Sequence, residues 1–285
     1  MPTYGVTGAS GHLGRRVIEN LLSRGVPAGE IVAVVRTPEK AADLAGRGVD
    51  VRLGDYSRPE TLPAALAGVR RLLLVSGSEP GKRVPQHAAV VEAATAAGVE
   101  RLLYTSILRA DTSTNPLAGE HKASEEIIAA AGLPYTLLRN SWYTENYTQQ
   151  LQQYLDTGQI VGAAGAGKVS AAPRADYAEA ATAALVGDEG GDVTYELGGT
   201  AFTFEELAAA VTEVTGTKVG YRDLPPAEYA AVLREAGLDA ATAEFVAAID
   251  SSIAAGDLET GSDDLTRLIG RPTGSLTEAV AAAVG

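Results

Sequence analysis

The chain of 285 residues contains no cysteine, one methionine, one tryptophan and three histidines. Without cysteine it has no disulfide, no thiol nucleophile and no thiolate ligand for a metal. The histidines, at positions 12, 87 and 121, are far apart and show no metal-ligand spacing such as H-E-x-x-H. These absences exclude thiol chemistry, and we expect no metal site.

Clusters of basic residues and long apolar runs are also missing. The 36 acidic residues outnumber the 23 basic ones, which gives a net charge of −13. We therefore expect neither nucleic acid nor an anionic membrane as a partner. No apolar run approaches the length of a membrane span, and no signal-type segment precedes the first strand, so a cytoplasmic protein is expected.

A glycine-rich turn stands near the start of the chain, between a strand candidate at 3–6 and a helix candidate at 15–22. Its glycines have the spacing G-x-x-G-x-x-G, where G-x-G-x-x-G is the usual one. A tight turn of this kind lets the backbone approach a pyrophosphate, which the positive end of the helix attracts. An ordinary turn is the alternative, but the flanking strand and helix favour a dinucleotide site. The residues assigned to it are Thr7, Gly8, Ser10, Gly11, His12, Leu13 and Gly14.

Arg36 indicates which dinucleotide binds. It follows the apolar run Ile31–Val35, at the place where an NAD site has an acidic residue for the ribose hydroxyls. A guanidinium can hold a 2′-phosphate through two parallel charge-assisted hydrogen bonds, whereas a carboxylate would repel it. The alternative is an arginine that only ends the strand in solvent. We favour NADPH over NADH.

Strand and helix patterns alternate through the first half, which predicts an α/β fold with a doubly wound parallel Rossmann sheet. Residues 1–140 are expected to form the NADP-binding core. Residues 141–285 are expected to form a smaller, mostly helical part that closes the acceptor pocket, with a strand near 193–197 returning to the core sheet. The expected strands of the first half are 3–6, 31–35, 50–54, 71–76, 101–105 and 135–139. Capping boxes at 203–206 and 275–278 each predict the start of a helix.

Nine stretches of the sequence match one known family: 7–14, 35–37, 54–56, 103–108, 120–121, 133–140, 142–147, 174–178 and 268–272. Together they resemble the atypical short-chain dehydrogenases/reductases of the NmrA-like group. The resemblance is strongest to the type-2 NAD(P)H:quinone oxidoreductases, relatives of the triphenylmethane reductases, and it covers nearly the whole chain. It implies NADPH binding and flavin-independent reduction of quinone-like acceptors on a two-part Rossmann architecture. From 54–56 we assign Asp55 and Tyr56 to the cofactor site.

The usual proton donor of this superfamily is missing. Standard members use a serine and a Tyr-x-x-x-Lys motif, but Ala118 stands four residues before Lys122, which in turn follows Ser106. Reduction of a simple ketone gives a basic alkoxide that needs a positioned acid. Hydride addition to a quinone gives a stabilised phenolate that water can protonate later. The sequence therefore favours direct hydride transfer governed by proximity and orientation.

Candidates for holding the nicotinamide and the acceptor come from three segments. Ser76, Gly77 and Ser78 follow the fourth strand at its carboxyl end, where ligands gather in such sheets, although a plain turn is the alternative. His121 and Lys122 lie near the start of a helix, where His121 is a pocket or a structural residue and Lys122 holds the nicotinamide ribose or is solvated. Asn140 and Trp142 offer an amide and a flat surface for a planar ring, but Trp142 could equally anchor the core.

Two other functions stay open beside a quinone reductase. NmrA-like proteins include regulators that bind dinucleotide without turnover, and the missing tyrosine suits them as well. A reductase dedicated to one biosynthetic substrate would use the same cofactor chemistry. The segment 142–147 and the lid-like C-terminal part favour an enzyme acting on a small quinone-like molecule, with a homodimer left open.

Overall fold

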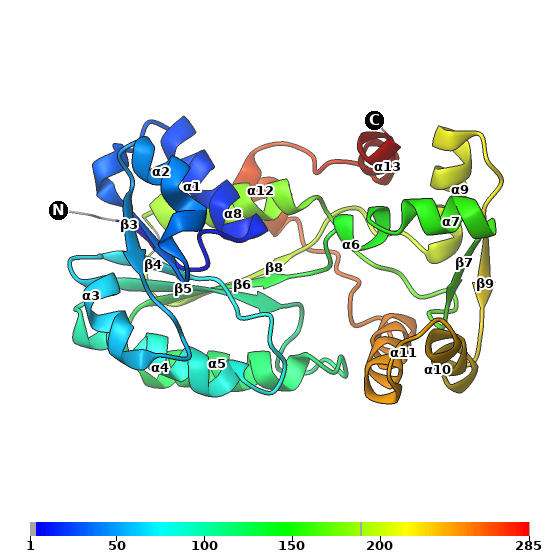
Figure 1. The fold of residues 1–285 in the computed structure, drawn as a ribbon, viewed down its shortest axis with the longest axis horizontal. Helices are drawn as coiled ribbons and strands as arrows, with labels where there is room; N and C mark the ends of the chain where they lie inside the picture. Colours follow the sequence, from blue (N-terminus) through cyan, green and yellow to red (C-terminus); the bar gives the residue numbers. More distant parts are fainter. Residues whose placement is uncertain (1–3, 189, 285) are drawn as a thin grey trace.

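The computed structural model describes residues 4–188 and 190–284, and a seven-stranded parallel sheet lies at its centre (Figure 1). The strand order is β3-β2-β1-β4-β5-β6-β8, which reverses direction between β1 and β4 as in a doubly wound fold. The predicted fold class is therefore confirmed. The strands are β1 (Tyr4–Val6), β2 (Ile31–Val35), β3 (Asp50–Leu53), β4 (Arg71–Leu74), β5 (Arg101–Ile107), β6 (Tyr135–Asn140) and β8 (Val193–Leu197).

Helices cover both faces of this sheet, so its central strands are buried; every residue of β2 and of β5 is buried. One face carries α1 (His12–Ser23), α2 (Ala42–Gly46), α8 (Arg174–Val186) and α12 (Asp264–Ile269). The other carries α3 (Leu62–Leu66), α4 (Arg83–Ala96) and α5 (Ala118–Ala130). Short 3₁₀ turns, η1 (Ala28–Glu30), η2 (Pro38–Ala41) and η3 (Pro59–Thr61), precede β2, α2 and α3.

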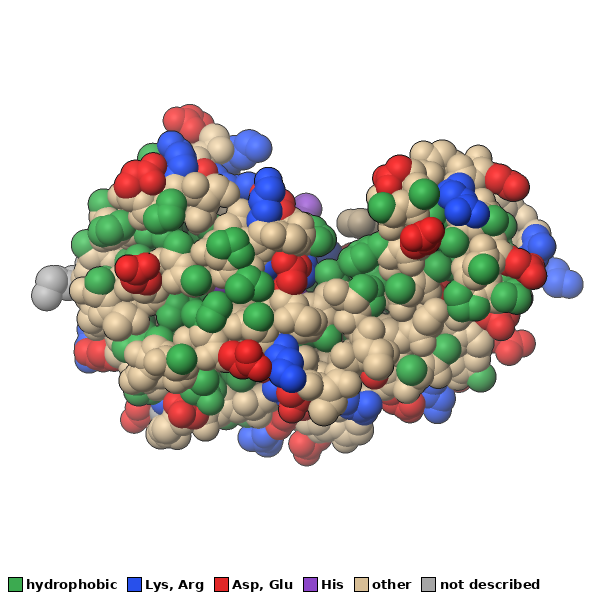
Figure 2. Space-filling view, turned by 90° about the horizontal axis from the view of Figure 1, so that it is seen from below, with side chains coloured by type: hydrophobic (Ala, Val, Ile, Leu, Met, Phe, Trp, Pro, Cys, Tyr) green, Lys and Arg blue, Asp and Glu red, His purple; other side chains and the backbone are tan. Residues whose placement is uncertain are grey.

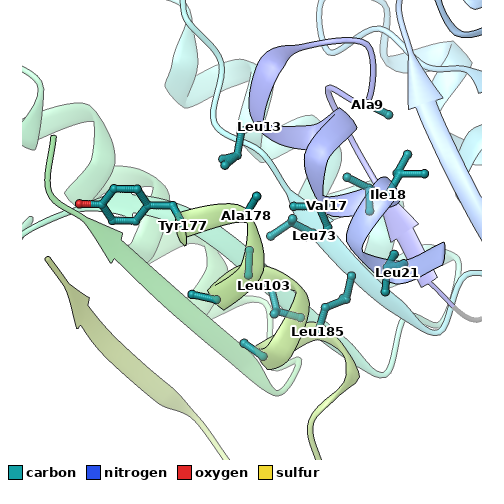
Figure 3. Close-up of a cluster of buried hydrophobic side chains, with 14 of the residues drawn as sticks. Ala9, Leu13, Val17, Ile18, Leu21, Leu73, Leu103, Tyr177, Ala178 and Leu185 are labelled. Carbon is teal, nitrogen blue, oxygen red and sulfur yellow. The ribbon is translucent and has the colours of Figure 1, made fainter. Parts of the chain in front are cut away.

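The packing of α1 against α8 fixes the glycine turn on the sheet (Figure 3). Leu13, Val17 and Leu21 recur at helical spacing on α1, and all three are buried. They pack near Ala178 and Leu185 of α8, a helix whose many alanines allow close approach. Burial of each large apolar side chain stabilises the fold by about 1.5–3 kcal/mol. This packing therefore holds the start of α1 in a fixed position on the sheet.

The chain after β6 builds a smaller part around a second, two-stranded parallel sheet of β7 and β9. The sequence did not predict this sheet, because both strands are short and one is largely exposed. Both expected capping boxes are present, at Thr203–Glu206 and at Ser275–Glu278. The elements are α6 (Glu145–Thr148), α7 (Leu151–Thr157), β7 (Gln159–Gly162), α9 (Phe204–Thr215), β9 (Gly220–Asp223), α10 (Pro226–Glu235), α11 (Ala240–Ala254) and α13 (Leu276–Val284).

The surface is hollowed between the larger body and the smaller lobe (Figure 2). The parallel strands of the main sheet place the segments that follow β1, β2, β4 and β6 at one edge of it. Within the described residues, no helix combines the length and the apolar character that crossing a membrane requires.

Candidate active site

The turn between β1 and α1 needs glycine at two positions. Gly8 has φ +58°, a left-handed conformation that favours glycine. At Gly14 a Cβ atom would lie 2.6 Å from the carbonyl oxygen of Gly8, so a side chain would force the turn apart. No side chain caps the first turn of α1, which begins at His12, three residues earlier than expected. Its N–H groups are therefore free to bind an anion.

Thr7 lies under this turn and is buried. Its hydroxyl donates to the carbonyl oxygen of Leu73 (3.2 Å) and accepts the N–H of Val75 (3.0 Å). The hydroxyl of Tyr56 donates to the same oxygen of Thr7 and lies 3.0 Å from the carbonyl oxygen of Val75. Thr7 therefore joins the turn to the end of β4, a role in shaping the site.

A cleft of about 450 Å³ lies at this edge of the sheet. It gathers every residue assigned to the cofactor except Thr7, which lies beneath it, and Lys122. Lys40, Val75, Glu79 and Gln86 also line it and were missed, because no motif distinguishes them in the sequence. Gly54 lines it as well; it belongs to the matching stretch 54–56 but was not assigned to the site. The assigned residues on its walls are Gly8, Ser10, Gly11, His12, Leu13, Gly14, Arg36, Asp55, Tyr56, Ser76, Gly77 and Ser78.

Arg36 follows β2 and its side chain is 68% exposed at the rim of the cleft. One of its nitrogens lies 3.3 Å from Oε1 of Glu79, whose Oε2 accepts a hydrogen bond from Lys82 at 3.0 Å. Lys40 lines the same rim. Although the chain is acidic overall, Arg36 and Lys40 thus place positive charge at the rim of the cleft, where it can attract an anionic ligand.

The segment after β4 is held by two side chains of α4. The N–H of Gly77 donates to Nε2 of His87 (3.0 Å), and Nε of Arg83 donates to the carbonyl oxygen of Gly77 (2.6 Å). Because Nε2 accepts, the proton of the imidazole is on Nδ1, which faces the hydroxyl of Ser124 at 2.8 Å. Burial, with a smaller effect from the charge of Arg83, lowers the pKa of His87 to about 4. His87 is therefore neutral at physiological pH, as an acceptor for Gly77 must be.

His121 and Lys122 do not line the cleft. The side chain of His121 is buried, and its Nδ1 lies 2.8 Å from the hydroxyl of Tyr104. Burial is the main cause that lowers the pKa of His121, to about 3. Lys122 is exposed, with its amine 3.5 Å from the carbonyl oxygen of Asp111. The geometry thus matches the structural alternative for His121 and the solvated alternative for Lys122.

The serine of the superfamily motif is engaged elsewhere. The hydroxyl of Ser106 donates to Oε1 of Glu125 at 2.5 Å, and Arg139 pairs with both oxygens of that carboxylate at 3.0 and 2.7 Å. Ser106 and Glu125 are buried. A charge pair this buried and this well hydrogen-bonded costs several kcal/mol to break, on the order of 3–5, so it ties β5, β6 and α5 together.

Asn140 and Trp142 lie at the end of β6 but face different surroundings. Asn140 is buried, and its amide oxygen has no hydrogen-bond partner. Trp142 is half-buried and lines a second pocket, which belongs to the smaller part. Asn140 lines neither the cofactor cleft nor this second pocket, so its role in holding the acceptor stays a prediction.

Comparison with known proteins decides the family. A family model described as NAD(P)H-binding matches residues 8–187, which is more than half of the chain. The chain belongs to this NAD(P)H-binding family. The family segment begins at Gly8 and ends just after α8, and so contains the glycine turn, Arg36 and every other residue that lines the cleft.

Relatives of this NAD(P)H-binding protein align over nearly its full length. Quinone oxidoreductase 2 of Escherichia coli is 47% identical, over 96% of both chains. An NmrA-like family domain-containing oxidoreductase of Aspergillus flavus is 30% identical over 94% of this chain and 90% of its own. These matches confirm the resemblance to the NmrA-like group.

Solved structures agree with this assignment. The Escherichia coli NADPH-dependent quinone oxidoreductase QOR2 complexed with NADPH has a TM-score of 0.96 at 45% identity, covering 99% of this chain and all of its own. The Citrobacter sp. triphenylmethane reductase complexed with NADP(H) has a TM-score of 0.94 at 41% identity, with the same coverage.

Within the described residues, no group of three or more His, Asp or Glu side chains could hold a metal ion.

Proposed function

We propose that this protein is an NADPH-dependent oxidoreductase that passes a hydride directly to a quinone or a similar conjugated electrophilic acceptor, without flavin or metal. One observation carries the proposal. The glycine turn, Arg36 and the segment 76–78 surround a single cleft, in a chain that matches an NADPH-complexed quinone oxidoreductase over its whole length. The related triphenylmethane reductase, also complexed with NADP(H), supports a conjugated acceptor.

The residues of the cleft fit this cofactor by their chemistry. The uncapped start of α1 would bind the pyrophosphate, and Arg36 with Lys40 would bind the 2′-phosphate. Bound NADPH supplies the hydride. Ser76, Gly77 and Ser78 would border the nicotinamide half of the cleft, since they follow β4 at the point where the strand order reverses.

The protein needs no positioned acid for this chemistry. Ala118, where the superfamily has its tyrosine, is buried on α5 and carries no polar group, and Ser106 is committed to Glu125. A phenolate leaving the site can take its proton from water, so orientation is the main task. We propose that Asn140 and Trp142 orient the acceptor. Residues 141–285 would close the acceptor pocket over the core formed by residues 1–140.

Oxidation of NADPH by the purified protein, with benzoquinone as acceptor and NADH in parallel, tests the proposal. The uncatalysed rate is subtracted, and oxygen is excluded to prevent redox cycling. We expect quinone-dependent loss of NADPH that is much slower with NADH. Tight binding of NADPH without turnover of any acceptor would overturn it in favour of the dinucleotide-sensing alternative. The cytoplasmic location, the homodimer and the wider short-chain dehydrogenase/reductase assignment stay predictions.

A further inference from the structure

The smaller part contains a pocket of about 800 Å³, larger than the cofactor cleft. Its walls come from α7, β7, α10 and α11, together with Trp142 and the start of α9. It shares no lining residue with the cleft at the edge of the main sheet. The pocket is thus distinct from the cofactor cleft, although Trp142, to which we assign orientation of the acceptor, forms part of its wall.

Five aromatic side chains line this pocket. They are Trp142, Tyr147, Tyr154, Phe204 and Tyr229. The rings of Tyr147 and Phe204 pack edge to face, with centroids 5.5 Å apart. Aromatic faces of this kind attract flat apolar rings and, through their quadrupoles, positive charge.

A buried carboxylate, that of Asp250, also lines the pocket. Asp250 is 6% exposed, and its Oδ2 accepts the N–H of Ala163 at 2.8 Å. Among the described residues it forms no ion pair; Arg222 lines the same pocket but its side chain is exposed. Burial raises the pKa of Asp250 to about 6, which leaves the group mostly ionised at neutral pH.

The backbone makes room for this carboxylate. A Cβ atom at Gly162 would lie 2.8 Å from Oδ2 of Asp250 and 3.1 Å from the ring of Phe204. The glycine at the end of β7 therefore lets the acidic group and the aromatic ring lie against the strand. Beside them, the hydroxyl of Tyr147 is buried and has no hydrogen-bond partner.

Within the described residues, Asp250 thus has a hydrogen-bond donor but no ion pair, and the hydroxyl of Tyr147 has no hydrogen-bond partner. A buried charge without a counterion is unfavourable, as is a buried hydroxyl without a hydrogen bond. A ligand that brings both a positive charge and N–H donors would satisfy the two together. A neutral quinone would bring only acceptors and would leave the charge of Asp250 uncompensated.

We propose that this pocket binds an aromatic molecule that carries a protonated amine, with the ammonium at Asp250 and Tyr147 and the ring against the aromatic wall. The inference goes beyond the proposed reductase function, because this ligand need not accept a hydride. The ammonium donates one hydrogen bond to the carboxylate and one to the tyrosine oxygen. Tyr154 and Tyr229 line the same pocket, and a ring face of either that meets the ammonium would add cation–π attraction.

The test uses a matched pair of probes, para-tert-butylbenzylamine and para-tert-butylbenzyl alcohol, which differ in charge but hardly in shape. Each is titrated into the full-length protein without NADPH at neutral pH. Binding is followed by calorimetry and by the emission of Trp142, the only tryptophan of the chain. We expect the amine to bind at least about tenfold more tightly than the alcohol and to change the emission of Trp142. Equal affinities, or binding that leaves this emission unchanged, would overturn the inference.

Two variants assign the charge preference to one carboxylate. Asp250→Asn keeps an acceptor for the N–H of Ala163 and should reduce the ratio of the two affinities to near one. Asp188→Asn makes the same change at an exposed residue that does not line the pocket and should keep the ratio. An unchanged ratio in Asp250→Asn would contradict the proposal. Because no cofactor is present, a failure here and a failure of quinone-dependent NADPH oxidation are separate results.

Discussion

The guanidinium of Arg36 lies 3.3 Å from the carboxylate of Glu79, across the rim of the cofactor cleft. Arg36 comes from the end of β2 and Glu79 from the segment that follows β4, so the pair bridges the cleft at its mouth. A 2′-phosphate and Glu79 would compete for the same guanidinium. The pair therefore links cofactor choice to the segment after β4.

Replacement of Arg36 by alanine should weaken NADPH binding and leave NADH binding nearly unchanged. A charge-assisted bidentate contact contributes about 1.5–3 kcal/mol, so the preference for NADPH should fall by roughly 10- to 100-fold. Dissociation constants for both cofactors, measured by nucleotide fluorescence, check this. Arg70→Ala, which also removes an exposed arginine from an ion pair, serves as the control. An unchanged ratio of the two constants would exclude Arg36 as the phosphate ligand.

Replacement of Glu79 by glutamine should have the opposite effect. It removes the charge that competes for Arg36, so NADPH should bind more tightly, by roughly two- to fivefold, because exposed pairs contribute about 0.2–1 kcal/mol. The gain should shrink in high salt, which screens exposed charges. Glu100→Gln, at another exposed ion pair, is the matched control and should change nothing. Weaker NADPH binding in Glu79→Gln would show that the carboxylate supports the site and does not compete with the phosphate.

Replacement of Gly14 by alanine should damage both folding and cofactor binding. The new methyl group would meet the carbonyl oxygen of Gly8 at 2.6 Å, and backbone atoms cannot move aside cheaply. A loss of about 1–3 kcal/mol in the free energy of unfolding is expected, by analogy with overpacked cores. Urea denaturation and NADPH titration measure the two effects. Gly119→Ala, in α5 with no neighbour within 4 Å of the added atom, should be neutral or slightly stabilising. A Gly14 variant as stable as the Gly119 variant would contradict the described turn.

The stability of the protein should fall in mild acid because His87 is buried in its neutral form. Its pKa is about 4 in the folded chain, below the usual value of 6.5, so the unfolded chain takes up a proton first. This contribution to stability is therefore complete above about pH 6.5 and is lost as the pH falls towards 4, by about 3 kcal/mol at most. His121 acts in the same direction, whereas Asp250, with its raised pKa, acts in the opposite one.

A pH series of urea denaturation isolates the contribution of His87. His87→Gln keeps an acceptor for the N–H of Gly77 but cannot be protonated, so its stability should depend less steeply on pH between 6.5 and 4. His12→Gln, at an exposed histidine, should follow the wild-type curve. If all three proteins follow parallel curves, the imidazole at position 87 is not the group that titrates.

The sequence predicted best those features that depend on neighbouring residues. The continuous apolar run 31–35 became a strand buried on both faces, and the glycine turn became the tight entry to α1. Arg36 reached the rim of the cleft because strand β2 ends there. Local spacing and strand direction were sufficient for each of these features.

Other features depend on contacts between distant segments. β7 pairs with β9 about sixty residues later; both strands are short, and β9 is largely exposed, so neither shows a strand pattern in the sequence. Asp250 reads as an ordinary polar residue of a helix. It becomes a buried charge only because α11 packs close to the end of β7, where Gly162 has no side chain in the way. Lys122 has the spacing of a catalytic lysine, yet its helix directs it towards Asp111.

The chain leaves the larger body after β6 and returns to it twice. It returns first as α8 and β8, and later as α12, which packs against α8. This path has a mechanical consequence. The backbone passes between the larger body and the smaller lobe repeatedly: after β6, before α8, after β8 and on either side of α12 (Figure 1). The two lobes are therefore joined by several connections and not by a single linker, so a protease that cuts one of them would leave the lobes joined.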